Sequence, residues 1–511
     1  MWEIFDRFRT KPWQGRPTIY SAVKAWDGSS DLPDEEPEQG GLRFSAGALD
    51  NVGVRHFGLD GEPQMSRLFR ALERVVTHGR DADRTTLYRL MLQYDAVVHA
   101  GALSARVQAS SLDREAVAEV ARWLATEAAD REPVKYGLIL LALCGSPRDL
   151  DLVMTYARHD EFTMHAVTAL ERVAEDVLAA ELAMAEQVRG WGKVSLVERI
   201  VEHGSDRADV RDWLLRRGFA NAVMDEYLAY ACAVAGRLHE ALAADTIDAE
   251  LRQGACAIVH ALINGGPAED MDDYDHGPAA VGHLLRHLAR TTEPRELMVV
   301  AAISSWLASD RDWSAAEARG WSADVRADIA SKTHAILRRD EVATRLRDAF
   351  RGDDRMERFA AWEAAGEAEV DLWEDAFALA QAEPETYYLY QWLSRTKDPM
   401  RLRRTITLAE QSLPLEEIAS GPAEEMFGGD ADMALTFVLQ ALPGSGQFSG
   451  PLVKAALRSP LVNVRYRATR VLESTTRPEW GSDVVATLLR AAAEEPDEDV
   501  KSALEELLPR I

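Results

Sequence analysis

The chain has 511 residues, 47% of them hydrophobic and 28% charged, a balance that is ordinary for a folded protein and excludes wholesale disorder. It is longer than the roughly 250–300 residues at which one compact core stops growing, so it forms either several domains or an elongated repeat array. Its 85 acidic and 58 basic residues give a formal net charge of −27, which disfavours nucleic acid and suits a basic protein partner.

The first predicted unit, residues 1–64, is rich in Gly and Pro, which interrupt regular helices. We expect a short opening helix followed by a long loop. The aromatic residues Phe44 and Phe57 favour an ordered loop over a disordered arm. Near its start, Glu3 and Asp6 stand where a secretory signal needs basic and apolar residues.

The second predicted unit, residues 65–290, consists of helices. Helix formers dominate it, and apolar residues recur with the 3.6-residue period, as in the stripe Leu68, Leu72 and Val75. Gly79-Arg80-Asp81 forms the first turn between helices. Later helix pairs are predicted at 114–128 with 134–144 and at 150–158 with 162–174. The part of the chain from Trp191 to His287 is less regular.

The third predicted unit, residues 291–511, continues the helices and ends in a repeat. Residues 452–472 align without a gap with residues 488–508, at a constant offset of 36. A fixed period in this range, with two short apolar helices in each copy, is typical of an α-solenoid, in which every unit stacks on its neighbours. We therefore predict an all-α superhelix with a Gly/Pro-rich N-terminal segment.

The repeated units resemble HEAT repeats of the HEAT/armadillo class. The positions that carry the resemblance are the inter-helix prolines, the start of the second helix and its inward-facing small and apolar residues: Pro460, Pro496, Val464, Arg465, Val500, Lys501, Ala468 and Leu472. Residues 191–236 also look similar to a stretch of bacterial HEAT-like proteins. The resemblance implies a concave helical surface that holds another macromolecule, and it implies no particular catalytic residue.

Cys144, Cys232 and Cys256 lie in apolar helical stretches, as buried free thiols in a reducing compartment do. No uncharged apolar run approaches the ~20 residues that cross a bilayer. We expect a cytoplasmic protein with no membrane partner.

A divalent metal is the first candidate ligand. His283 and His287 are four residues apart and share a helix face, and Asp272 belongs to the acidic stretch before that helix. The pattern matches neither the metalloprotease motif nor a calcium loop. A solvated acidic loop at a helix N-terminus is the alternative.

Two further candidate sites use basic and aromatic residues. Arg55 and His56 lie in the glycine-rich stretch and are candidates for binding a small molecule, with an ordered cap as the alternative. The remaining candidates combine bulky aromatic and basic side chains, as binding hot spots do: Trp191, Arg216, Arg217, Tyr227 and Tyr230. A HEAT-like DNA glycosylase would need a basic surface, which the net charge opposes.

We expect a non-enzymatic scaffold that binds a protein partner, as an adaptor, a regulator or a toxin-neutralising protein. Without a complete catalytic constellation in the sequence, we expect no resident cofactor. An enzyme on a HEAT-like scaffold, with a metal or small-molecule site, is the alternative. Nucleic-acid binding is the second alternative.

Overall fold

The computed structural model describes residues 11–35, 44–57 and 62–510, and over these residues the only regular elements are helices. One isolated β-bridge, between Glu425 and Leu461, is the exception. The predicted all-α class is therefore confirmed. Within the same described ranges, no helix is both long enough and apolar enough to span a bilayer.

The chain divides into two compact units. Of the described residues, unit 1 comprises 11–35, 44–57, 62–291 and 302–336, and unit 2 comprises 292–301 and 337–510. The described residues of the predicted N-terminal segment thus belong to unit 1.

The helices of unit 1, with α18 and the last residue of α20 contributing to unit 2 as well, are α2 (Ile19–Ala25), α3 (Ala48–Val52), the π-helical turn η1 (Gly53–Phe57), α4 (Glu62–His78), α5 (Asp81–Met91), α6 (Ala96–Ala109), α7 (Arg114–Glu127), α8 (Arg131–Cys144), η2 (Pro147–Asp149), α9 (Leu150–Ala157), α10 (Asp160–Val173), α11 (Val177–Ala185), α12 (Trp191–Gly204), α13 (Ala208–Trp213), η3 (Leu214–Gly218), α14 (Glu226–Ala235), α15 (Leu238–Ala241), α16 (Ala249–Asn264), α17 (Gly277–Leu288), α18 (Pro294–Ala308), α19 (Ser314–Ala318) and α20 (Ala323–Leu337).

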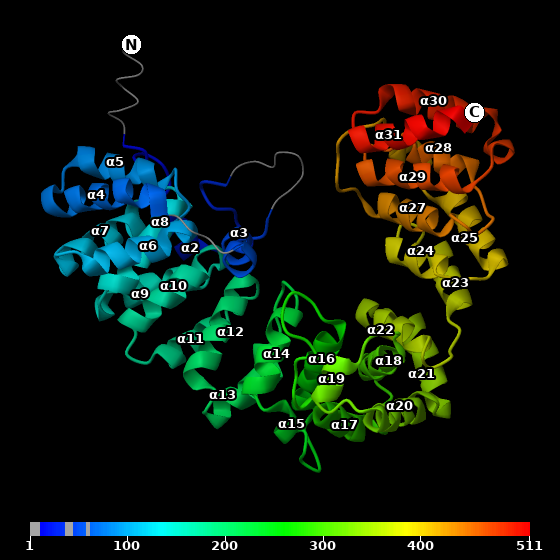
Figure 1. Ribbon diagram of the computed structural model, residues 1–511, viewed down its shortest axis with the longest axis horizontal. Helices are drawn as coiled ribbons and strands as arrows, with labels where there is room; N and C mark the ends of the chain where they lie inside the picture. Colours follow the sequence, from blue (N-terminus) through cyan, green and yellow to red (C-terminus); the bar gives the residue numbers. More distant parts are fainter. Residues whose placement is uncertain (1–10, 36–43, 58–61, 511) are drawn as a thin grey trace. The chain divides into compact units, whose positions relative to one another are not determined.

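These helices pack in two layers. The even-numbered helices from α4 to α16 contact one another in order, each meeting the next even-numbered helix. Odd-numbered helices pack against them, as α5 does on α4, α7 on α8, α9 on α10 and α11 on α12. Figure 1 shows this succession from α4 to α12. We call the even-numbered row the even layer, and its core lies between the two rows.

Local sequence explains the pairing of α7 with α8. Asp113 caps α7, because its carboxylate accepts a hydrogen bond from Ala116 N at 2.8 Å. Helix α8 begins at Arg131, earlier than predicted, since Pro133 falls in the first turn, where its missing N–H has no partner to lose. Gly137 then lets the helices approach closely, because a Cβ there would lie 3.0 Å from Ala121 O.

The helices that belong wholly to unit 2 are α21 (Asp340–Arg351), α22 (Arg355–Ala365), α23 (Trp373–Ala382), α24 (Tyr387–Ser394), α25 (Pro399–Ser412), α26 (Leu415–Ile418), α27 (Asp430–Ala441), α28 (Gly450–Ala456), α29 (Val462–Ser474), α30 (Arg477–Glu494), α31 (Glu498–Leu507) and η4 (Leu508–Arg510).

Alternate packing recurs in unit 2, where α24 contacts α27, α27 contacts α29 and α29 contacts α31. The two copies of the sequence repeat are joined by Arg465 of α29, a fully buried guanidinium. It makes two hydrogen bonds, of 2.8 and 2.6 Å, to the carboxylate of Glu495. The same side chain donates to Ser459 O and Pro460 O, so it fixes the turn before α29 as well.

Candidate functional site beneath residues 44–57

Residues 44–57, which we call the docked segment, lie on the even layer of unit 1, where α3 is drawn beside α10 and α12 (Figure 1). Earlier in the chain, α2 packs on the opposite, odd-numbered row against α7 and α9. Ile19 N donates to Ala128 O at 2.9 Å, and Trp13 packs against Tyr88 and Trp123. The N-terminal part of the chain therefore contacts both layers of unit 1.

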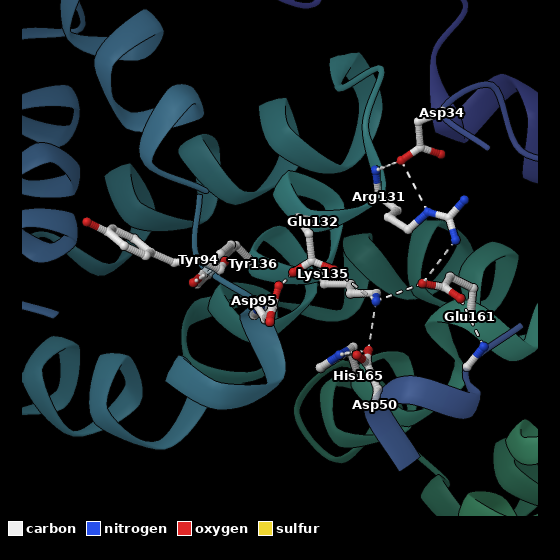
Figure 2. Close-up of polar contacts among 12 residues, drawn as sticks. Asp34, Asp50, Tyr94, Asp95, Arg131, Glu132, Lys135, Tyr136, Glu161 and His165 are labelled. Carbon is white, nitrogen blue, oxygen red and sulfur yellow. Dashed lines mark hydrogen bonds and ion pairs between the residues drawn. The ribbon is translucent and has the colours of Figure 1, made fainter. Parts of the chain in front are cut away.

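A buried lysine lies at the centre of the site (Figure 2). Lys135 of α8 is only 3% exposed, and its Nζ lies 2.8 Å from Asp50 Oδ2, 2.7 Å from Glu161 Oε1 and 3.0 Å from Glu132 Oε1. Asp50 comes from the docked segment, and the two glutamates come from α8 and α10. A buried ammonium is tolerated only when it is paired in this way.

The charges of this cluster reinforce one another. Burial alone would raise the pKa of Asp50, but a hydrogen bond from His165 and the charge of Lys135 outweigh it and lower that pKa to about 2. Because Asp50 is therefore ionised, His165 Nε2 must donate the 3.2 Å hydrogen bond that joins α10 to the docked segment. Burial would also raise the pKa of Glu161, and Lys135 and Arg131 reverse this and lower it.

Arg131, at the first position of α8, extends the cluster to residues 34 and 35. Its backbone N–H donates to Asp34 Oδ2 at 2.7 Å, and its guanidinium pairs with Glu35 at 2.6 Å. Glu161 lies 3.6 Å from the same guanidinium. Glu132 meanwhile accepts a hydrogen bond from Ala96 N at 2.6 Å, at the first residue of α6. The cluster therefore ties the N-terminal part of the chain to α6, α8 and α10.

Glycines bring the docked segment close to α10. Gly47 has φ +73, and a Cβ at this position would overlap with the carbonyl oxygen of Asp160. Its N–H donates to Glu161 Oε2 at 2.9 Å. The side chain of Asp160 accepts a hydrogen bond from Gly192 N at 2.7 Å, which caps α12, and burial raises the pKa of Asp160. Residue 160 thus contacts both the docked segment and the start of α12.

The far end of the docked segment is attached to α12. Asn51 is 1% exposed and accepts a 2.9 Å hydrogen bond from Ser195 Oγ. Four residues later, Arg55 binds both carboxylate oxygens of Glu198. Arg55, predicted as a ligand-binding residue, is therefore paired within the protein. His56 lies in η1, and its side chain is outside the part of the structure that is described.

The outward face of the docked segment is apolar. Phe44, Leu49 and Val54 are 59%, 66% and 52% exposed, although the segment itself is held by buried polar contacts. A cavity of about 350 Å³ lies on the same layer, between α6, α8 and α10. His165 lines this cavity together with Ser104, Thr168, Glu171, Arg172 and apolar residues. Polar groups therefore fix the segment, and apolar groups face outward.

The predicted hot-spot residues fall into two groups in the structure. Trp191 is buried at the start of α12, with its ring 5.0 Å from that of Tyr227, so these two are brought together. Burial raises the pKa of the half-buried Tyr230. Arg216 pairs with Asp212 and Asp248, and Arg217 pairs with Glu250, so both arginines link neighbouring helices.

The predicted metal ligands are not gathered around one point. His283 Nδ1 lies 3.2 Å from His239 O and His287 Nε2 lies 3.0 Å from Leu242 O, so both rings donate to the backbone at α15. Asp272 instead pairs with Arg311. Over the described ranges, no group of three or more His, Cys, Asp or Glu side chains is arranged to hold a metal ion.

The central residues Lys135, Glu161 and His165 were not singled out as a site from the sequence. One signal was present, since Lys135 is a lone charge between Val134 and Tyr136 at the start of an apolar helix. Glu132 lies three residues before it on the same helix, but Asp50 and Glu161 come from distant parts of the chain, and no local spacing reveals them. No known protein-family profile matches this chain, and no curated protein matches its sequence.

Proposed function

We propose that this protein is a non-enzymatic HEAT-like α-solenoid that holds a protein partner on the even layer of unit 1. Three features support a HEAT-like repeat. The even-numbered helices contact one another in order, the C-terminal sequence repeat corresponds to successive helix pairs, and Arg465 joins one copy to the next.

The observation that carries the proposal is the contrast between the two faces of the docked segment. Its inward face is fixed by Asp50, Asn51 and Arg55, whereas Phe44, Leu49 and Val54 are more than half exposed. Apolar side chains presented on a rigid support are typical of interface hot spots, because little conformational freedom is lost when a partner covers them. The acidic net charge favours a basic partner.

The charged groups of the site fit a structural role better than a catalytic one. Lys135 is fully engaged by Asp50, Glu132 and Glu161, so it is not presented to a substrate. The same pairing explains why the segment is held in one position. We therefore assign the cluster the task of positioning the outward apolar residues.

The test is affinity purification of the full chain from cells of its native source, with quantitative mass spectrometry of what co-purifies. We expect one stoichiometric partner with the wild type and its loss in the double variant Leu49→Ser/Val54→Ser. Val234→Ser is the matched control, since Val234 is 48% exposed in α14 of the same unit, away from the docked segment. Recovery of no stoichiometric partner, or equal recovery with the double variant, would refute the proposal.

A further inference from the structure

Residues 424–430 of unit 2, which we call the Met-Phe segment, follow α26 and end at the first residue of α27. Glu425 N donates to Pro460 O at 3.3 Å, and Val462 N donates to Glu425 O at 3.1 Å, which makes a parallel β-bridge with the turn before α29. Gly428 lies so close to Leu461 that a Cβ at Gly428 would overlap with its side chain. The segment is thus pressed against the turn.

Despite these contacts, every residue from Glu424 to Asp430 is exposed. Met426 and Phe427 are 50% and 63% exposed. Two more large side chains are exposed on the adjoining helices, Met433 in the first turn of α27 (37%) and Tyr466 in α29 (42%), and these helices contact each other. Methionine and aromatic side chains together provide an adaptable apolar surface.

The stretch of chain around the Met-Phe segment carries one sign of charge. From Glu416 to Asp432 the chain has six acidic residues and no Lys, Arg or His. Five of these carboxylates, on Glu416, Glu417, Glu424, Glu425 and Asp430, are exposed and form no ion pair within the described residues.

Elsewhere in unit 2, carboxylates are commonly paired with basic side chains. Glu374 binds Arg404 through both oxygens, at 2.8 and 3.0 Å, and Asp375 lies 2.7 Å from a nitrogen of Arg351. The carboxylates around Met426 and Phe427 that form no ion pair therefore give this stretch a local negative charge.

We propose that the Met-Phe segment is a docking site for a basic segment of a protein partner that carries apolar side chains at its centre. Met426 and Phe427 provide the apolar centre, and the carboxylates at 424, 425 and 430 provide a rim that attracts lysine and arginine. This inference rests on the proposed function only in taking the chain to be a protein-binding scaffold, and it adds a second surface and the chemistry of what binds there.

The test uses the purified full chain and a fluorescein-labelled synthetic peptide in which lysines flank a centre of leucine and phenylalanine. Binding is measured by fluorescence anisotropy at about 50 and about 150 mM NaCl. We expect Met426→Ser/Phe427→Ser, which leaves the net charge unchanged, to raise the Kd about tenfold or more. The double substitution Glu424→Gln/Glu425→Gln should weaken binding chiefly at the lower salt concentration.

Met400→Ser is the matched control, because Met400 is the most exposed methionine of unit 2 at 72% and lies in the first turn of α25. A second control is a peptide of the same composition with its lysines and apolar residues scrambled. Equal affinity of the wild type and Met426→Ser/Phe427→Ser would overturn the inference, since attraction to net charge alone would then explain binding. So would an equal loss in Met400→Ser, or equal binding of the scrambled peptide.

Because this assay requires no natural partner, its failure is distinguishable from failure of the proposed function. If the peptide binds without specificity, the Met-Phe segment is not a docking site. The Leu49→Ser/Val54→Ser comparison still tests the proposed function. Circular dichroism and the thermal midpoint of each variant check that the substitutions leave the fold unchanged. Both Met426 and Phe427 are exposed, so their replacement by serine removes no core contact.

Discussion

Lys135 Nζ lies 2.7 Å from Glu161 Oε1, and the two side chains are 4% and 8% exposed. The ammonium is thus compensated by carboxylates that belong to two helices and to the docked segment. Because the buried ammonium of Lys135 is shielded from bulk water, these carboxylates must compensate its charge.

Replacing Lys135 by methionine should destabilise unit 1 strongly. The substitution keeps most of the volume of the side chain but removes the cation that the buried carboxylates of Asp50 and Glu161 share, and breaking a buried pair costs about 3–5 kcal/mol. The measurement is denaturant unfolding followed by circular dichroism. The exposed pair of Lys454 with Asp483 provides the control, and Lys454→Met should cost no more than about 1 kcal/mol. Equal effects of the two substitutions would show that the cluster carries no special stability.

Replacing Gly47 by alanine should release the docked segment. The new methyl group would overlap with Asp160 O, and the residue would be held at φ +73, which disfavours any side chain. Hydrogen exchange read by mass spectrometry should show lost protection of the amides of residues 48–57. Gly79→Ala is the matched control, since Gly79 has φ +62 and a Cβ there meets no atom within 4 Å. Protection that survives Gly47→Ala would contradict the observed packing.

Acid should destabilise the protein through His159. Burial lowers the pKa of this imidazole to about 4, while the unfolded ring keeps its ordinary value of about 6.5. The unfolded state therefore binds the proton more readily, so the stability that depends on the neutral ring is present above pH 6.5 and is lost as the pH falls toward 4. The full loss from this group is about 3 kcal/mol.

The pH dependence is measured by urea unfolding between pH 7 and pH 4. His159 Nδ1 accepts the N–H of Glu161 at 3.3 Å and so caps α10. His159→Asn keeps a capping oxygen and removes the titration, and it should flatten the pH profile. His78→Asn, at an exposed position at the end of α4, should leave the profile unchanged. A wild-type slope in His159→Asn would assign the acid sensitivity to other groups.

His283 and His287 should behave as hydrogen-bond donors to α15. Each substitution by alanine removes one hydrogen bond to a backbone carbonyl, of His239 or Leu242, and should cost about 1 kcal/mol. We expect the metal content of the purified protein, measured by inductively coupled plasma mass spectrometry, to be the same in the wild type and in the double variant. A stoichiometric metal that is present in the wild type and absent from the double variant would restore the metal-site hypothesis.

Helix positions could be predicted from the sequence because they depend on local patterns. The turn expected at Gly79-Arg80-Asp81 is observed, with α4 ending at His78 and α5 beginning at Asp81. The error at the start of α10, predicted at Phe162 and observed at Asp160, arises because His159 acts as the cap. The predicted helix start was therefore wrong where histidine, an uncommon N-cap residue, caps the helix.

The buried cluster could not be predicted in the same way. Asp50 and His165 are separated by 115 positions, and Lys135 gains Asp50 as a partner only when the docked segment lies on α8 and α10. The glycine-rich stretch predicts Arg55 as a ligand-binding residue, whereas in the structure Arg55 forms an ion pair with Glu198 of the same chain. Spacing along a sequence reveals which residues share a helix face, and it does not reveal which distant segment covers that face.

The ion pair between Arg55 and Glu198 bears on the order in which the parts of unit 1 assemble during synthesis. The two residues are 143 positions apart, so the docked segment is made long before α12, its last attachment point, exists. Until then Asn51 and Arg55 lack their partners Ser195 and Glu198, although the partners of Asp50 in α8 and α10 already exist. Stacking of the intervening helices is what brings the two ends of this long loop together. We therefore expect the docked segment, although it is synthesised early, to reach its final position only after α12 has formed.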